Sequence, residues 1–362
     1  MKTQKFLIEP NLVDLSKTVI NTVLGKKFYE LRFNNLLDEK INDAESINFI
    51  LADGLGFKNL QETDSWLNSN ISKSIFTTFP SSTNVALSSL TLANNPGKTG
   101  IIGYFMFDKK YNHLINALVW NSENTNLIKN EFYKKQKTIW STLNESKIFY
   151  NIFQPKNLVG TTLSNFIYFS EKVTGYLDNK ELIELMSDSI FLENRFNFIY
   201  YPKIDVAAHL YGVGSKEWSR EIFEFEKLIN ILNTSTNKKS YTVVTSDHGL
   251  VNITKNNKFE IQYSEDIKIY GDQRSVFING EKNKINRAFK NVPGELINKA
   301  ELKEYFEISE DNFIERIFPD FCFLLKDSSI VIPKHLKAPL IGYHGGLSDS
   351  EILIPIIEIS NY

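Results

Sequence analysis

The chain has 362 residues, of which 42% are hydrophobic and 23% charged, enough to bury a large core in one α/β domain or two smaller ones. Its formal net charge of −2 argues against a nucleic-acid-binding surface. The single cysteine, Cys322, excludes an internal disulfide and a zinc cluster built from cysteines.

The sequence shows neither a membrane span nor a targeting segment. No stretch approaches the roughly 18 consecutive apolar residues that cross a bilayer. The segment MKTQKFLIEPNLVDL lacks the apolar core of a signal peptide, and its acidic residues disfavour a transit peptide. We therefore expect a soluble, cytoplasmic protein.

The first candidate site residue follows the first expected strand. Residues 1–45 are predicted to be helical, and the apolar run 47–52 predicts a buried strand. Asp53 and Gly54 come directly after it, before a helix expected over 58–68. A strand that ends in Asp-Gly before a helix is typical of the carboxyl edge of a parallel sheet, where ligands bind. Asp53 taken alone is equally typical of an ordinary turn.

A cluster of hydroxyl residues follows in the segment FTTFPSSTNVALSSL. The apolar spacing after Thr83 predicts a buried helix that begins at about this residue, with Ser82 as its N-cap. Backbone N–H groups and the helix dipole favour an anion at such a position. A hydroxyl there is able to act as a nucleophile toward phosphate if its pKa is lowered, although capping alone also explains these residues.

A second strand leads to another acidic residue. Residues 105–195 continue the alternation of short strands and helices without a motif, and the apolar run 196–201 predicts the next buried strand. Asp205 and His209 follow it at a spacing of four, which places both on one face of a helix and allows them to share a metal. A further amphipathic helix is expected over 215–233.

A third strand, predicted over 241–245, ends in Asp247, His248 and Gly249. Three separate strands of parallel type therefore end in Asp, Asp and Asp-His. Such an ending is weak evidence by itself, but its recurrence predicts that these side chains meet at one edge of the sheet.

The rest of the chain divides into two parts. Residues 254–340 are more polar and interrupted, and we interpret them as an inserted subdomain with its own strands and about two helices, one of them around 301–317. The last part contains His344 in YHGG, a short helix capped by Ser348 or Asp349, and a final buried strand in ILIPIIEI.

Histidine placement strengthens the prediction of a metal site. Of five histidines, His113 and His335 lack acidic neighbours, whereas three lie beside strand ends or glycines. Three Asp, three His and one hydroxyl have the number and type of ligands that suit two zinc-class ions with positions open for a substrate. The predicted set is Asp53, Asp205, His209, Asp247, His248, His344 and one hydroxyl of the segment FTTFPSSTNVALSSL.

The same residues carry a family resemblance. The chain resembles the alkaline phosphatase superfamily, in its type I phosphodiesterase/nucleotide pyrophosphatase branch. The matching stretches occur in the family's order and span residues 47–357: ADGLG, FPSSTNVALSSL, DVAAH, TSDHGL and YHGGLSDSEILIPII. The resemblance implies an alkaline-phosphatase-like α/β sandwich, with a mainly parallel central sheet and helices on both faces. We expect one catalytic domain over 1–362 that contains an inserted subdomain over 254–340.

The resemblance also implies a role for each residue. One divalent ion is assigned to Asp205, His209 and His344, and the other to Asp53, Asp247, His248 and the Thr83 oxygen; the ions are expected to be Zn²⁺, with Mn²⁺ as an alternative. Thr83 is the implied nucleophile because of its spacing to PGKTGIIGY, and Thr78, in TFP, is the alternative.

Two positions depart from the family pattern. Thr99 replaces the histidine that many relatives have before the glycine of HGIIG. Tyr104 falls where nucleotide pyrophosphatases have an asparagine that contacts the phosphoryl oxygen. A phenol donates a hydrogen bond but does not reproduce an amide, so Tyr104 is a candidate substrate-binding residue that leaves nucleotide specificity open.

The function expected from the resemblance is hydrolysis of a phosphodiester or pyrophosphate bond in a small-molecule substrate. Thr83 attacks phosphorus at a two-metal site, and water then hydrolyses the phospho-threonine intermediate. The alternatives are a phosphomonoesterase or phosphonate hydrolase on the same site and, from another class, a catalytically silent metal-binding protein. A sulfatase is disfavoured because Cys322 lies outside the C/S-x-P-x-R motif that sulfatases need. A mutase of the same superfamily is disfavoured because the region 254–340 is too small and too late in the chain to be its cap domain.

Overall fold

A seven-stranded sheet forms the centre of the molecule in a computed structural model that describes residues 8–120, 131–169, 171–187, 195–234, 238–308, 311–334 and 336–362. The strand order is β2-β17-β8-β1-β7-β5-β6, and β17 alone runs against the other strands. The strands are β1 (Ser46–Ala52), β2 (Ile71–Phe76), β5 (Tyr150–Pro155), β6 (Val173–Tyr176), β7 (Phe196–Tyr201), β8 (Ser240–Thr245) and β17 (Leu353–Ser360). This arrangement confirms the predicted, mainly parallel sheet.

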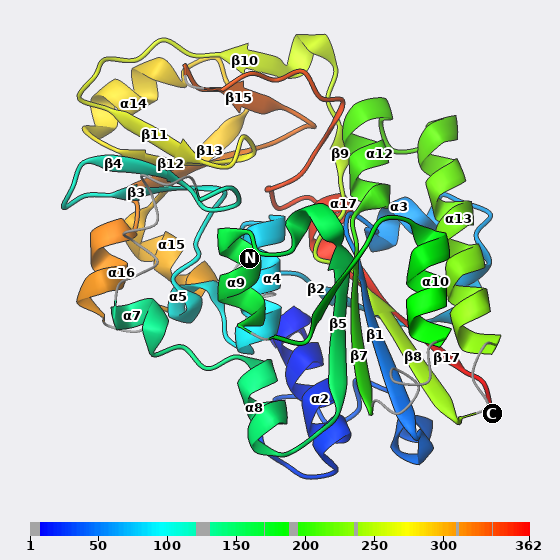
Figure 1. Ribbon diagram of the computed structural model, residues 1–362. Helices are drawn as coiled ribbons and strands as arrows, with labels where there is room; N and C mark the ends of the chain where they lie inside the picture. Colours follow the sequence, from blue (N-terminus) through cyan, green and yellow to red (C-terminus); the bar gives the residue numbers. More distant parts are fainter. Residues whose placement is uncertain are drawn as a thin grey trace.

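Helices cover both faces of this sheet, as expected (Figure 1). Alternate residues of β1 point to opposite sides: Phe49 and Leu51 pack in one hydrophobic cluster, and Ile50 and Ala52 in another. The first cluster includes residues of α2 (Leu12–Leu24), α4 (Thr83–Leu92), α8 (Ile139–Glu145) and α9 (Thr162–Tyr168). The second includes residues of α3 (Phe57–Gln61), α10 (Asn179–Ser187), α12 (Lys203–Tyr211) and α13 (Lys216–Thr234).

Two helix predictions were too long. The helix expected over 1–45 ends at Leu24, because Gly25 adopts a left-handed conformation and the Asn21 side chain accepts hydrogen bonds from the backbone of residues 28 and 29. The helix expected over 58–68 ends at Gln61. It is followed by a separate 3₁₀ helix, η2 (Trp66–Asn70), for which Ser65 serves as the cap.

A second, antiparallel sheet has the order β13-β14-β12-β11-β3-β4. Its strands are β3 (Phe105–Asp108), β4 (His113–Asn116), β11 (Lys268–Gly271), β12 (Ser275–Asn279), β13 (Gly294–Asn298) and β14 (Phe321–Leu325). Four of them come from the region 254–340, whereas β3 and β4 precede it by more than a hundred residues. That this region is a separate subdomain stays a prediction.

The remaining elements are short. In the region 254–340 they are η4 (Lys255–Asn257), β10 (Lys258–Glu260), α14 (Lys282–Ala288), α15 (Lys299–Phe306), α16 (Asn312–Ile317) and β15 (Ile330–Ile332). Elsewhere they are η1 (Glu39–Asp43), α5 (Pro96–Thr99), α7 (Glu131–Lys134), η3 (Lys156–Leu158), β9 (Val251–Asn252), β16 (Gly342–Tyr343) and α17 (Asp349–Ile352). The helix expected around 301–317 is therefore two helices, α15 and α16.

Candidate active site

The three predicted strand ends are neighbours in the central sheet. β1 pairs in parallel with β7 on one side and with β8 on the other. Asp53 follows β1 directly, Asp205 lies in the first turn of α12 just after β7, and Asp247 and His248 lie just after β8. The carboxyl ends of adjacent parallel strands share one edge of the sheet, so these side chains are brought together.

The spacing of Asp205 and His209 works as predicted, because α12 places both on one helix face. His209 Nε2 lies 3.2 Å from Asp205 Oδ2, and His209 Nδ1 lies 2.8 Å from the carbonyl oxygen of Gly342. That carbonyl fixes the orientation of the ring and precedes His344 by two residues.

Around His248 Nε2 the structure gathers three further oxygen donors. The ring nitrogen lies 3.0 Å from Thr83 Oγ1, 3.3 Å from Asp247 Oδ2 and 3.6 Å from Asp53 Oδ1. Thr83 is the first residue of α4, as predicted, and Ser82 is its N-cap. These four residues are the set that the sequence assigned to one metal ion.

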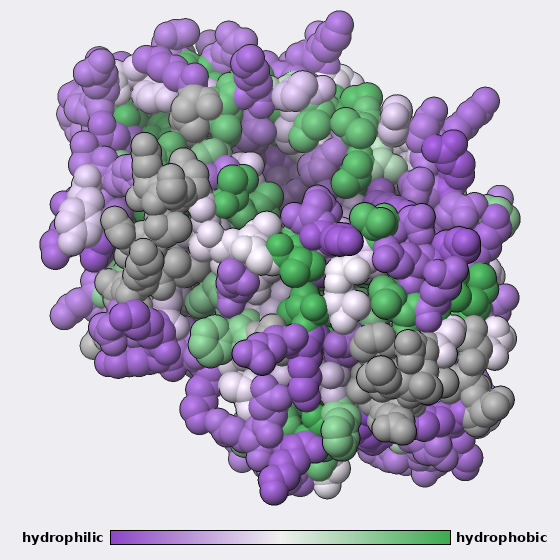
Figure 2. All heavy atoms as spheres, viewed as in Figure 1, coloured by the Kyte–Doolittle hydropathy of each residue, from purple (hydrophilic) through white to green (hydrophobic). Residues whose placement is uncertain are grey.

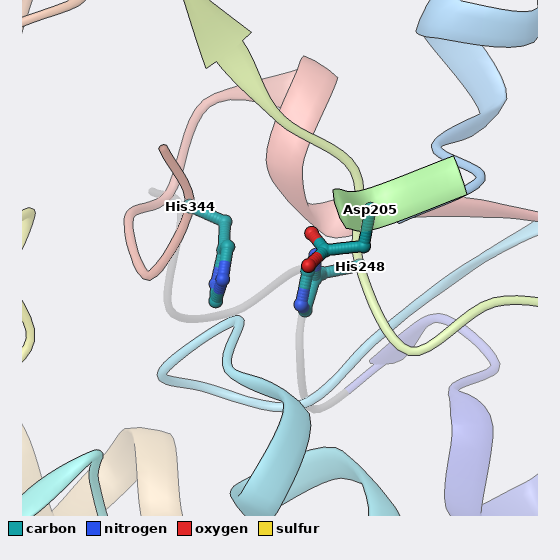
Figure 3. Close-up of side chains that lie close together, drawn as sticks. All are labelled: Asp205, His248 and His344. Carbon is teal, nitrogen blue, oxygen red and sulfur yellow. The ribbon is translucent and has the colours of Figure 1, made fainter. Parts of the chain in front are cut away.

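His344 lies next to this group and belongs to the other predicted set. Its ring stacks on that of His248 with centroids 3.6 Å apart, and its Nδ1 lies 2.8 Å from the carbonyl oxygen of Ser81. Ligand atoms of Asp205, His248 and His344 lie within 4.8 Å of one another (Figure 3). Those of Asp53, Asp247 and His248 do the same.

The grouping differs from the sequence prediction in two residues. His248 takes part in both clusters, although only one was assigned to it. His209 contacts Asp205 but belongs to neither cluster, and its ring centroid lies 5.2 Å from that of His344.

Buried polar atoms without hydrogen-bond partners favour a cation here. Among the described residues, Asp53 Oδ1, Asp205 Oδ1 and Asp247 Oδ2 are buried and accept no hydrogen bond. Their companion oxygens are held: the Tyr200 hydroxyl donates to Asp53 Oδ2, and the Gly54 N–H donates to Asp247 Oδ1 at 3.1 Å. Buried carboxylate oxygens without partners are costly unless a cation binds them, so the donor set fits divalent ions.

The carboxylates illustrate the electrostatic cost of this cluster. Burial raises the pKa of Asp53 well above its ordinary value, and the charges of Asp247 and Asp205 raise it further. Burial also raises the pKa of Asp247. Asp205 differs: burial acts to raise its pKa, but the neighbouring histidines, His209 foremost, outweigh this effect and hold it at about 2. Divalent ions would relieve the repulsion among these acids.

The histidines divide in a similar way. Burial lowers the pKa of His248 to about 4 and, together with the neighbouring His248, that of His344 to about 3. Both rings are therefore neutral near pH 7, the form that binds a metal. Burial also acts to lower the pKa of His209, but Asp205 outweighs it and raises the value.

A cavity of about 700 Å³ opens at this cluster. Thr83, Asp53, Asp205, His209 and His344 line it, as does Tyr104, the candidate substrate-binding residue. Figure 2 shows a shaded hollow in the surface between the second sheet and α12. Thr78 does not line the cavity; its hydroxyl donates to the carbonyl of Pro80 at 3.4 Å.

Part of the cavity wall is apolar. Leu87, Leu163, Ile167 and Tyr168 come from α4 and α9, and all four are buried. Four phenylalanines that flank the nucleophile segment, Phe76, Phe79, Phe105 and Phe107, do not line the cavity. Phe79, for example, packs in the core against Tyr305 and Phe306.

The polar residues of the cavity wall that sequence reasoning missed include Gln154, Asp272 and Lys337. Gln154 ends a strand in FQP, and Asp272 follows Gly271, which has a φ of 84° in a tight turn. Both positions carry the same strand-end signal that identified Asp53. Arg274 does not line the cavity, because its guanidinium is buried against Glu351 at 2.6 and 2.9 Å.

Comparison with known proteins agrees with the fold and the motifs. The family model for type I phosphodiesterase/nucleotide pyrophosphatase matches residues 49–312, which is most of the chain. The chain therefore belongs to this family of hydrolytic enzymes, within the alkaline phosphatase superfamily. No curated protein sequence matches it significantly.

Solved structures share the fold at low sequence identity. Murine ectonucleotide pyrophosphatase/phosphodiesterase 5, in an inactive form in complex with AMP, matches with a TM-score of 0.66 and 15% identity over 86% of this chain and 87% of its own. Phosphonoacetate hydrolase from Sinorhizobium meliloti, in complex with phosphonoacetate, matches with a TM-score of 0.65 and 13% identity over 88% and 90%. In the described part of the chain, no helix combines the length and apolarity of a membrane span.

Proposed function

We propose that the chain is a metal-dependent hydrolase that cleaves a phosphodiester or pyrophosphate bond through a phospho-threonine intermediate at Thr83. The observation that carries this proposal is the gathering of Thr83 Oγ1, Asp53 Oδ1 and Asp247 Oδ2 around His248 Nε2 within 3.6 Å. A threonine hydroxyl is a poor nucleophile near pH 7 unless its pKa is lowered, and a divalent ion held by these donors supplies that effect.

The proposal assigns two ions, Zn²⁺ with Mn²⁺ as an alternative, to seven residues. Asp53, Thr83, Asp247 and His248 hold one of them in this proposal, and Asp205, His209 and His344 hold the other. The close pair Asp205 and His209 and the stacked rings of His248 and His344 favour two adjacent ions rather than one. When bound, such ions neutralise charge on the phosphoryl oxygens and on the leaving oxygen.

The residues of the chain then carry the two displacements. Thr83 Oγ1 forms a bond to phosphorus while the bond to the leaving oxygen breaks, which leaves on Thr83 a phosphoryl group that still bears the second substituent of the substrate. The proton that the Thr83 hydroxyl loses is balanced by the one that the leaving oxygen takes up. Water attacks that phosphorus in the second step and restores the hydroxyl. The position of Thr83 at the start of the ten-residue helix α4 directs backbone N–H groups and the helix dipole toward the anionic phosphoryl group.

The cavity supports a diester more than a monoester. Among the described residues that line it, Lys337 is the one Lys or Arg, and its side chain is exposed. A diester carries one ionisable oxygen fewer than a monoester, so it needs less fixed positive charge. The apolar wall of α4 and α9 has room for its second organic group.

Lys337 also gives the alternative its main support. A cation at the cavity wall would suit the extra charge of a phosphomonoester or of an acidic phosphonate, so both remain secondary candidates on the same site. The catalytically silent alternative is disfavoured because all seven predicted residues are present and each of them lies in direct contact with another or in one of the two clusters. The cytoplasmic location stays a prediction.

Metal-dependent hydrolysis of an aryl phosphodiester tests the proposal. We expect purified protein to contain about two divalent ions per chain, to lose nearly all turnover on chelation and to regain it with Zn²⁺ or Mn²⁺. Elemental analysis and the rate of aryl alcohol release measure both effects. Full activity in metal-free protein would contradict the proposal, whereas a preference for Mn²⁺ would change only the ion.

A further inference from the structure

The turn between β11 and β12 reaches from the second sheet into the active-site cavity. Asp272 and Gln273, both in this turn, line the same cavity as Thr83. The turn is closed by a hydrogen bond from the Asp272 N–H to the Ser275 carbonyl at 3.0 Å, and Gly271 enters it with a left-handed φ of 84°. A rigid turn of the second sheet is therefore part of the cavity wall.

Asp272 contacts the chain on both sides of the nucleophile segment. The Ser82 hydroxyl donates to Asp272 Oδ1, and the Tyr104 N–H donates to Asp272 Oδ2 at 3.2 Å. Ser82 directly precedes Thr83 and is the N-cap of α4, yet its hydroxyl does not cap the helix. The Ser82 hydroxyl is therefore bonded to Asp272 and does not accept a hydrogen bond from the backbone of the first helical turn, which is the usual partner of an N-cap side chain.

The next residues of the turn hold the loop that carries His344. Arg274 forms a buried ion pair with Glu351, and Glu351 accepts a hydrogen bond from the Gly346 N–H at 2.8 Å. The Ser275 hydroxyl donates to the carbonyl of Gly345. A single turn thus joins the nucleophile segment to the loop after β16.

We propose that Asp272 is a positioning residue of the active site, which sets the place of Thr83 through Ser82 and of the Tyr104 backbone through its N–H. The inference rests on the proposed function, since it assigns to Thr83 the role of nucleophile. It gives the second sheet a part in the reaction: its β11–β12 turn completes the active site.

The geometry favours positioning over a purely structural role. Only 7% of Asp272 is exposed, and a buried carboxylate is costly unless donors satisfy it. Both oxygens of Asp272 accept from groups that flank the reacting residue, so the carboxyl group fixes two separate segments at once. Burial raises the pKa of Asp272 to about 7, against the opposing effect of the Ser82 hydroxyl and the Tyr104 N–H.

An asparagine at this position keeps the two contacts. Its oxygen can accept from the Tyr104 N–H, and its amide nitrogen can donate to the Ser82 oxygen, because a hydroxyl is both a donor and an acceptor. Alanine removes both contacts. Asp272→Asn and Asp272→Ala therefore separate the loss of positioning from the loss of charge.

The experiment measures kcat and KM for an aryl phosphodiester in metal-loaded wild type, Asp272→Ala, Asp272→Asn, Ser82→Ala and the double variant of Ser82→Ala with Asp272→Ala. We expect Asp272→Ala to lower kcat about ten- to a hundredfold, because small displacements of a nucleophile cost this much, while KM stays within about threefold. Asp272→Asn should keep kcat within about threefold of wild type. The double variant should be no slower than Asp272→Ala, because both changes remove the same hydrogen bond between Ser82 and Asp272.

Asp266→Asn is the matched control, because Asp266 is an exposed acid just before β11 that pairs with Lys284. It should leave kcat unchanged, and the metal content of every variant should equal that of wild type. If Asp272→Ala does not fold, Ser82→Ala and Asp272→Asn decide the question: a normal kcat in Ser82→Ala overturns the inference.

Three further results would overturn it: a normal kcat in folded Asp272→Ala, an equal loss in Asp272→Asn and Asp272→Ala, or full additivity of the Ser82 and Asp272 changes. Failure of the proposed function is distinct, because Thr83→Ala would then be as active as wild type. Failure of the inference alone leaves Thr83→Ala inactive.

Discussion

Two regions of the molecule supply the candidate active site, and they differ in how they do so. The carboxyl edge of the central sheet contributes Asp53, Asp205, Asp247 and His248 directly after strands that pair side by side. The β11–β12 turn of the second sheet contributes Asp272, which contacts residues around the nucleophile rather than the metal-type cluster.

The two regions differ in how their buried carboxylates are satisfied. At the sheet edge, burial and like charges raise the pKa values of Asp53 and Asp247, a cost that bound cations offset. At the turn, Asp272 is satisfied by hydrogen bonds from the protein itself. The sheet edge therefore has buried carboxylate oxygens without hydrogen-bond partners, whereas Asp272 has its partners within the protein.

The largest effect is expected at Thr83, on the sheet-edge side of the comparison. Thr83→Ala should lower kcat by at least about a thousandfold, whereas Thr83→Ser should keep a substantial part because the oxygen remains. Thr78→Ala serves as the control, since its hydroxyl faces Pro80 and not the cavity. An inactive Thr78→Ala beside an active Thr83→Ala would show that the nucleophile lies in TFP instead.

A substitution at His209 tests which residues belong to the proposed metal site, because His209 contacts Asp205 but belongs to neither group of close ligand atoms. We expect His209→Ala to weaken the affinity for one ion by at least about tenfold, the scale seen when a ligand or its partner is lost. Titration with Zn²⁺ followed by calorimetry measures this. His113→Ala, on β4 of the second sheet, is the matched histidine control. Two ions bound with unchanged affinity in His209→Ala would remove this residue from the site.

Substrate preference tests what the cavity wall adds to the metal-type cluster. We predict that kcat/KM for an aryl phosphodiester exceeds that for the matching monoester by at least about tenfold, or about 1.4 kcal/mol of transition-state stabilisation. Both assays are run at equal metal loading. A clear monoester preference would mean that Lys337 reaches the phosphoryl group, and Lys337→Ala should then reverse that preference.

The last prediction concerns the pH dependence of stability at the second region. Because the pKa of Asp272 is raised to about 7 in the folded state, the folded protein binds a proton that the unfolded chain releases between about pH 4 and 7. The contribution of this group is present at low pH and is lost as pH rises, by at most about 4 kcal/mol. Asparagine does not titrate, so the Tm of Asp272→Asn relative to wild type should rise between pH 5 and pH 8.

Metal-free protein is the sample for this comparison, so that the ions do not contribute. Asp266→Asn serves again as the control, because its exposed carboxyl group lies outside the turn. An equal Tm difference at both pH values would show that Asp272 does not titrate in this range.

Much of the sheet edge was predictable from the sequence, because hydrophobic periodicity and the residues that follow each strand are local signals. The strands over 47–52, 196–201 and 241–245 are found within one residue of their predicted bounds, and α4 begins at Thr83 as expected. The antiparallel direction of β17 was not predicted, since a buried apolar run fits either direction.

The contacts of the turn were beyond sequence reasoning for a physical reason. Ser82 and Asp272 are separated by 190 residues, and nothing local indicates that their side chains meet. Arg274 and Glu351 are 77 residues apart, and their pairing depends on the packing of the β11–β12 turn against α17. The end of α2 at Gly25 was missed although it is a local signal, because a glycine in the left-handed conformation is a common helix end.

The most direct test of Thr83 as the nucleophile is to trap the intermediate. Metal-loaded protein is mixed with an aryl phosphodiester, quenched in acid within the first turnovers and digested for mass spectrometry, with Thr83→Ala and Thr78→Ala in parallel. We predict a substrate-derived phosphoryl adduct on Thr83 in wild type and Thr78→Ala, and none in Thr83→Ala. Turnover without any adduct on the peptide that contains Thr83, or an adduct on Thr78, would contradict the proposed mechanism.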